Sequence, residues 1–110
     1  MNQKDESLKD FVLEQLQGLE EVAARRMFGG HGLYQDETFF GIVHKGKLFF
    51  KINETTIAAY RTRKMKPFRP NGKQTLKTYY QVPFEIIDDA DGLRQWAVKA
   101  VQCQEKKGKG

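Results

Sequence analysis

Apolar residues recur every three or four positions near both ends of the chain, the spacing that places side chains on one face of a helix. The N-terminal stripe is Leu8, Phe11, Val12, Leu16 and Leu19. The C-terminal stripe is Leu93, Trp96, Ala97, Ala100 and Val101. Ser7 is expected to cap the first helix, Gly18 to end it, and residues 1–6 to be frayed.

Between these stripes the pattern changes to short runs of aromatic and β-branched residues, which is typical of strands. Segments 22–34, 38–43 and 47–52 are predicted as three strands joined by short polar turns. Short connections favour antiparallel pairing, so the three strands are expected to form a meander.

A second helix is predicted after Asn53, which we expect to be its N-cap, and Pro67 ends it. Segment 67–70 is then extended at a sheet edge, because its prolines have no N–H to donate. Asn71-Gly72 is a turn signal, and 75–82 is the next strand. The prediction is an α+β fold: a largely antiparallel five-stranded sheet with helices on one face, in the order α-β-β-β-α-β-β-α.

The 110 residues suit a single domain, predicted over 1–104, with a disordered basic tail over 105–110. No apolar run is long enough to span a membrane, and the N-terminus has no apolar signal region. The single cysteine, Cys103, fits a reducing compartment, so a cytoplasmic location is expected.

Three glycines in four positions, Gly29, Gly30 and Gly32, are the most unusual feature of the sequence. Consecutive N–H groups in such a loop can bind phosphate, but the lysine of a P-loop and the spacing of a dinucleotide fold are absent. The preferred interpretation is a kinked first strand that curls under a helix.

No constellation of catalytic or metal-binding residues is apparent. His31, His44 and Cys103 are isolated and lack the spacing of zinc ligands. Ser7 is the only serine and is already explained as a cap. We therefore expect no enzyme, no metal and no cofactor.

Basic residues are unevenly distributed, since no acidic residue occurs between Glu54 and Glu85. Phe68, Tyr79 and Tyr80 lie in or beside this interval, and aromatic rings flanked by basic residues can hold single-stranded nucleic acid. The candidate nucleic-acid-binding residues are Arg61, Arg63, Lys64, Lys66, Arg69 and Lys73.

Several segments in order resemble the N-terminal domain of the TfoX/Sxy family, bacterial regulators of competence for DNA uptake. The resemblance covers about residues 8–101 and rests on 25–34, 40–43, 48–51, 65–68, 79–83 and 93–97. The family often has glycine before Met65, where this chain has Lys64. The implied motif residues, which are candidates for interaction, are Arg26, Met27, Phe28, Gly29, Gly30, His31, Gly32 and Tyr34.

The resemblance implies a stand-alone, non-enzymatic regulatory module without a second helical domain. Two hypotheses follow. In the first, the sheet or the glycine-rich strand docks a protein partner or a second copy, through exposed aromatic residues among Phe39, Phe40, Phe49 and Phe50. In the second, the basic stretch 61–77 binds nucleic acid.

Overall fold

The computed structural model describes residues 3–27 and 29–108, with side chains described as far as Gln104. Four helices and six strands occur in the described residues: α1 (Gln3–Gln15), β1 (Val22–Met27), β2 (Gly30–Gln35), β3 (Thr38–His44), β4 (Lys47–Lys51), α2 (Ile57–Thr62), β5 (Pro67–Asn71), β6 (Gln74–Gln81), α3 (Phe84–Ile87) and α4 (Ala90–Gly108). The α+β class is confirmed.

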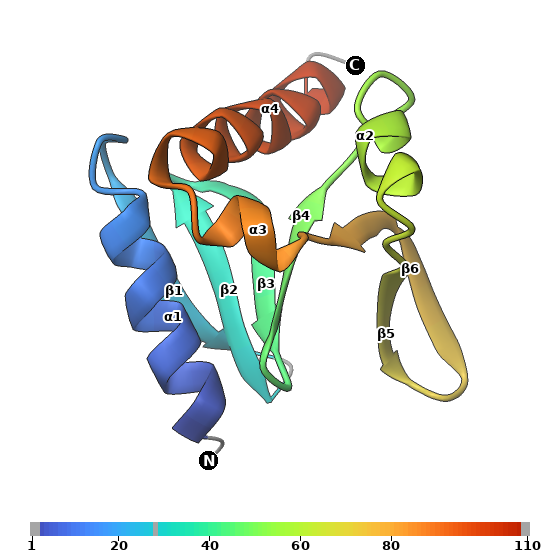
Figure 1. Ribbon diagram of the computed structural model, residues 1–110, viewed down its shortest axis with the longest axis horizontal. Coiled ribbons are helices and arrows are strands. Elements are labelled where there is room, and N and C mark those ends of the chain that lie inside the picture. Colours follow the sequence, from blue (N-terminus) through green and yellow to red (C-terminus); the bar gives the residue numbers. More distant parts are fainter. Residues whose placement is uncertain (1–2, 28, 109–110) are drawn as a thin grey trace.

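The strands form one sheet in the order β1-β2-β3-β4-β6-β5, and every described pair is antiparallel. Helices α1, α3 and α4 lie in front of this sheet in Figure 1, and α2 stands beside the end of α4. The β5–β6 hairpin projects at a steep angle from the other strands (Figure 1). Strands β1 and β5 are therefore the two edges of the sheet.

The prediction of five strands is wrong because segment 22–34 is two strands. The chain reverses between Met27 and Gly30, which are paired with each other at the end of the β1–β2 hairpin. Gly29 has φ +75°, a conformation that glycine adopts without steric cost. Phe28 lies outside the described residues. The predicted order also lacks the one-turn helix α3 that follows Pro83.

The N-terminal residues that were expected to be frayed are helical from Gln3, and Ser7 lies inside α1 as an exposed residue and not at its cap. Asp5 is only 2% exposed. Its carboxylate accepts the N–H groups of Lys45 (3.1 Å) and Gly46 (2.6 Å) in the β3–β4 turn. A charged side chain thus ties the first turn of α1 to the sheet.

Helix α2 begins and ends differently from the expectation. Its N-cap residue is Thr56, and Asn53 instead organises the preceding turn by accepting the Thr55 N–H at 2.8 Å. At the C-terminal end, Lys64 has φ 62° and Met65 N–H donates to the Tyr60 carbonyl at 3.0 Å. This is a Schellman-type ending, in which glycine is the favoured residue at the position of Lys64.

The sheet is packed on both faces. The main core lies between the sheet and the helices and includes Phe40, Phe50, Val12 and Leu93, all 0% exposed. A second cluster of Ile42, Phe49, Phe68 and Tyr79 occupies the opposite face. Because the β5–β6 hairpin is bent, the Phe68 ring reaches Phe49, with ring centroids 4.7 Å apart.

This packing contradicts the expectation that aromatic residues of the central strands are exposed for docking. Phe40 and Phe50 are buried on the helical face, Phe49 is 6% exposed, and Phe39 is half-buried. The hydrophobic effect has covered these rings with helices on one side and with the bent hairpin on the other.

Helix α4 extends to Gly108, past the boundary predicted at residue 104. The side chains of 105–108 and all of 109–110 lie outside the described part, so a disordered tail stays a prediction. No helix among the described residues is both long enough and apolar enough to cross a membrane.

We predict that Asp5→Asn lowers the free energy of unfolding by about 1–3 kcal/mol, because the buried N–H groups of the β3–β4 turn lose a charged acceptor. Urea unfolding followed by circular dichroism measures this change. Asp10→Asn is the control, since Asp10 is an exposed residue of the same helix. Equal midpoints for the two variants would contradict the anchoring role of Asp5.

Candidate interaction surfaces

The glycine-rich motif forms the β1–β2 hairpin and its contact with β3. A Cβ atom placed on Gly30 would collide with the main-chain oxygen of Val43. A Cβ atom on Gly32 would collide with the Met27 sulfur and lie 2.9 Å from the Phe39 ring. These two glycines are therefore explained by close packing, and the motif is a structural hairpin more than a ligand loop.

Glu6 of α1 joins the motif to the helical face. One carboxylate oxygen lies 3.5 Å from His31 Nε2 and 3.7 Å from an Arg26 guanidinium nitrogen, and the other lies 3.4 Å from Lys9 Nζ. His31 is 4% exposed, whereas the Arg26 side chain is largely exposed. Of the motif residues, His31 and Arg26 thus serve the α1 contact.

On the opposite face, a row of three aromatic rings with a cation at each end crosses five strands. Arg25 lies 4.7 Å from the centre of the Tyr34 ring, and Tyr34 packs on Phe39 with centroids 5.2 Å apart. Phe39 contacts Tyr79 at 5.6 Å, and Lys51 lies 5.3 Å from the Tyr79 ring. Burial raises the pKa of Tyr79 to about 12, so its hydroxyl is neutral at physiological pH. Met27 lies on the same face as Arg25, two positions away in β1, and its sulfur is 4.0 Å from the Tyr34 hydroxyl.

The six basic residues predicted to contact nucleic acid are all exposed. They occur in and after α2 and along the β5–β6 hairpin. Arg63 also faces α3 and α4, since it lies 3.5 Å from Glu85 and 5.3 Å from the Trp96 ring centre. Arg69 donates to the Gly72 carbonyl at 3.3 Å within the hairpin.

The charge of the molecule is polarised. Residues 38–84 hold ten Lys or Arg residues and one Glu, a net charge of +9, which leaves −4 for the rest of a chain whose net charge is +5. This segment comprises β3, β4, α2, β5 and β6, so the basic strands are contiguous at one side of the sheet.

The rings that were considered for base stacking are not available beside these charges. Phe68 is 0% and Tyr79 7% exposed. Half-buried Tyr80 packs on Tyr60, with centroids 6.1 Å apart. The surface around the six basic residues therefore carries positive charge, but none of these three rings is exposed for a base to stack on.

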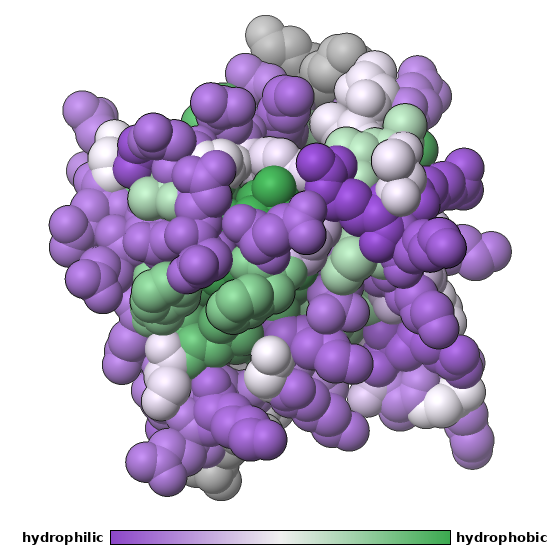
Figure 2. Space-filling view, viewed as in Figure 1, coloured by the Kyte–Doolittle hydropathy of each residue, from purple (hydrophilic) through white to green (hydrophobic). Residues whose placement is uncertain are grey.

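An exposed apolar patch lies on the helical face. Phe84, the first residue of α3, is 74% exposed, the largest exposed apolar side chain among the described residues. Figure 2 shows apolar surface gathered over α3 and the neighbouring part of α1, surrounded by hydrophilic surface. The α3 turn is held in place by the Gln15 side chain, which donates to the Ile87 carbonyl at 2.9 Å.

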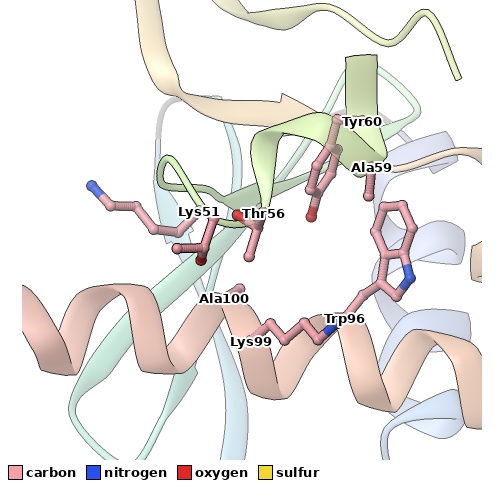
Figure 3. Close-up of a pocket in the computed structure, with 8 residues that line it drawn as sticks. Lys51, Thr56, Ala59, Tyr60, Trp96, Lys99 and Ala100 are labelled. Carbon is pink, nitrogen blue, oxygen red and sulfur yellow. The ribbon is translucent and has the colours of Figure 1, made fainter. Parts of the chain in front are cut away.

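A small cavity of about 80 Å³ lies between α2 and α4, with Thr56, Tyr60, Trp96 and Lys99 in its wall. In Figure 3 the Tyr60 hydroxyl points toward this space, whereas the Lys51 side chain extends away from it. Burial, with the nearby Cys103 thiol, raises the pKa of Tyr60. The cavity is smaller than the roughly 300 Å³ at the lower end of ligand pockets.

Residues with nucleophilic or metal-binding chemistry are dispersed. Cys103 is 5% exposed, with its sulfur 4.0 Å from the Thr56 hydroxyl. His44 is 8% exposed and packs edge-on against Phe68. Within residues 3–27 and 29–104, no group of three or more His, Cys, Asp or Glu side chains is placed to hold a metal ion.

Sequence reasoning missed Asp5, Glu6 and Phe84. The first two lie in a polar segment that has no apolar periodicity of its own. For Phe84 a signal existed, since a phenylalanine directly after Pro83 at a strand end belongs to neither the strand pattern nor the last helical stripe.

We predict that Gly30→Ala lowers the free energy of unfolding by about 1–3 kcal/mol or more, because β2 must move away from the Val43 carbonyl. Thermal unfolding compares this variant with Gly72→Ala. Gly72 has no atom within 4 Å of an added Cβ, so its substitution is expected to be neutral or slightly stabilising. The close-packing interpretation fails if both variants melt like the wild type.

Comparison with known proteins agrees with the sequence motifs. No curated protein matches the chain. The family model described as the TfoX N-terminal domain matches residues 14–104, which covers the glycine-rich hairpin, the whole sheet and most of α4. The chain therefore belongs to the TfoX N-terminal domain family.

Proposed function

We propose that this protein is a non-enzymatic regulatory module that binds a protein partner through Phe84 and the apolar patch around it. The exposure of Phe84, 74%, is the observation that carries the proposal. Exposure of a phenylalanine ring to water is unfavourable in free energy. Exposed apolar patches with a polar rim are typical of protein-binding sites.

The arrangement of α3 suits a binding hot spot. Pro83 is buried, and its carbonyl accepts the N–H of Ile86 at 3.0 Å and of Ile87 at 3.2 Å. Together with the Gln15 contact, these bonds pre-organise the turn. Little conformational entropy is then lost when Phe84 enters a pocket of a partner.

The charge near the patch indicates the chemistry of the partner. Residues 78–93 contain four acidic residues and no basic one, and α1 is also rich in acidic residues. Glu85 and Asp91 are paired with Arg63 and Arg94, whereas Asp88 and Asp89 are exposed directly after α3. A partner segment that combines apolar side chains with lysine or arginine complements this surface.

The absence of catalysis is part of the proposal, and the placement of the reactive side chains supports it. His31 faces Glu6, His44 packs on Phe68, and the Cys103 sulfur lies beside the Thr56 hydroxyl. All three are less than 9% exposed, so a substrate would not reach them without a local opening of the fold.

Photo-cross-linking tests the proposal. A benzoylphenylalanine at position 84 is expected to form discrete adducts in cells, and mass spectrometry is expected to locate them in segments of net positive charge. The same group at position 73, at the tip of the β5–β6 hairpin, is the control. Adducts that are no stronger from position 84 than from position 73 would contradict the proposal.

Substitution then measures the strength of the contact. Phe84→Ala is expected to weaken binding of the identified partner segment by about 30-fold, since hot-spot side chains contribute 2 kcal/mol or more. Its thermal stability is expected to match the wild type, because the side chain is mostly in water already. Titration calorimetry and thermal melting give the two readouts.

Nucleic-acid binding is the second candidate, favoured by the net charge of +9 in residues 38–84 and by the exposure of the six predicted basic residues. Without exposed rings, binding is expected to be salt-sensitive and indifferent to base sequence, because phosphate contacts alone contribute.

Fluorescence anisotropy across a salt series tests this candidate with labelled single- and double-stranded DNA and RNA. Lys66→Glu combined with Lys73→Glu is expected to reduce the slope of log affinity against log salt by about 2. The control, Lys4→Glu with Lys99→Glu, makes the same change in charge outside the β5–β6 hairpin. Equal effects of the two double variants, or no binding at low salt, would exclude a site on this hairpin.

A further inference from the structure

The two edges of the sheet differ in how they are protected against pairing with another strand. Edge strand β5 carries Pro67 and Pro70 and pairs irregularly with β6, so it offers few free N–H groups. Edge strand β1 has no proline and pairs with β2 in an unbroken register over Val22–Met27. A regular, proline-free edge is a template for an added strand.

The hydrogen-bonding phase of β1 shows which groups are directed away from β2. Val22 lies opposite Gln35 in the β1–β2 pair. At the preceding position of the same register, the Asp36 N–H donates to the Glu21 carbonyl at 2.8 Å. In an antiparallel ladder the hydrogen-bonded positions alternate, so Ala23 and Arg25 also face β2. The N–H and C=O groups of residues 22, 24 and 26 therefore point outward along the free edge.

Charged side chains often keep another strand away from a sheet edge, but the two arginines of β1 lie over the faces of the sheet. The Arg25 guanidinium lies over the Tyr34 ring at 4.7 Å, on the face of the sheet opposite the helices. Arg26 reaches Glu6 on the helical face, 3.7 Å away. Ala23 and Ala24, between these arginines and Val22, have side chains too small to block the approach of another backbone.

The sequence of this edge is complementary to itself when read in opposite directions. Residues 20–26 are Glu-Glu-Val-Ala-Ala-Arg-Arg, acidic at one end, small in the middle and basic at the other. Glu20 and Glu21 lie in the turn before β1, where Glu21 has φ 60°, so they precede the ladder. In an antiparallel pair centred on Ala24, this acidic turn of one copy lies at the end of the ladder that carries the long side chains of Arg25 and Arg26 of the other copy.

We propose that β1 pairs with β1 of a second copy of this chain, joining two six-stranded sheets through an antiparallel ladder about the Ala24 positions. The outward groups of residues 22, 24 and 26 then form about six hydrogen bonds across the two-fold axis. Opposite charges at the two ends fix the direction and the register. The patch around Phe84 takes no part in this contact.

Sedimentation velocity at protein concentrations up to about 1 mM tests the proposal, because a ladder of this size forms a concentration-dependent dimer. Ala24→Pro removes an outward N–H and keeps the β1–β2 ladder. We expect at least a 10-fold increase in the dimer dissociation constant with an unchanged circular dichroism spectrum. Phe84→Ala is expected to leave dimerisation unchanged.

Charge exchange provides the second test. Glu21→Lys and Arg25→Glu are each expected to weaken self-association, and an equimolar mixture of the two variants is expected to form heterodimers. The double variant is expected to dimerise again, since it restores opposite charges in the exchanged positions. Glu54→Lys and Lys73→Glu make the same changes far from β1 in the chain and are the controls.

The proposal is overturned if the wild-type protein is monomeric at every concentration. It is also overturned if a dimer forms that neither Ala24→Pro nor the single charge variants weaken. A dimer that is lost with Phe84→Ala and kept with Ala24→Pro would assign self-association to the apolar patch instead.

Discussion

The contact of Gly30 with the main-chain carbonyl of Val43 determines how the first hairpin sits on the rest of the sheet. A side chain at position 30 would meet this carbonyl, so glycine lets β2 pair with β3 at this point, while β1 pairs with β2 alone. The same placement brings Arg26 and His31 to Glu6 of α1. The position of the first hairpin thus determines both which strand forms this edge of the sheet and which residues contact α1.

Packing on both faces of the sheet leaves three kinds of surface for recognition. The helical face carries an apolar patch among acidic helices, the β5–β6 side carries positive charge without exposed rings, and the β1 edge carries unpaired backbone groups. These surfaces occupy different elements, so one copy can use them independently. A module of this kind suits a regulator that assembles partners, which is the role we propose.

Much of the fold followed from the sequence because periodicity reports which side chains are buried. The stripes around Val12 and Leu93 became α1 and α4, and segments 38–43 and 47–52 became β3 and β4. The hairpin inside 22–34 was not recognised, since glycines at a turn and glycines in a kinked strand are alike in sequence. Lys64 has the left-handed conformation that glycine adopts most easily at a helix end, which the sequence alone did not reveal.

The candidate site was less predictable, because exposure depends on which faces the tertiary structure covers. Phe49 and Phe68 were candidates for contact but bury each other once the β5–β6 hairpin bends. Phe84 lies in no periodic element, and only the position of α3 reveals its exposure. Asp5 is similar, since its burial depends on a turn 40 residues away in the chain.

Amide hydrogen exchange in β1, followed by nuclear magnetic resonance, tests most directly the claim that the first hairpin presents an open edge. In dilute protein, the amides of Ala23 and Arg25 are expected to exchange slowly, and those of Val22, Ala24 and Arg26 rapidly. In concentrated protein all five are expected to be protected. Uniformly slow exchange in dilute protein would mean that the edge is already covered, and rapid exchange of all five would mean that β1 is not held by β2.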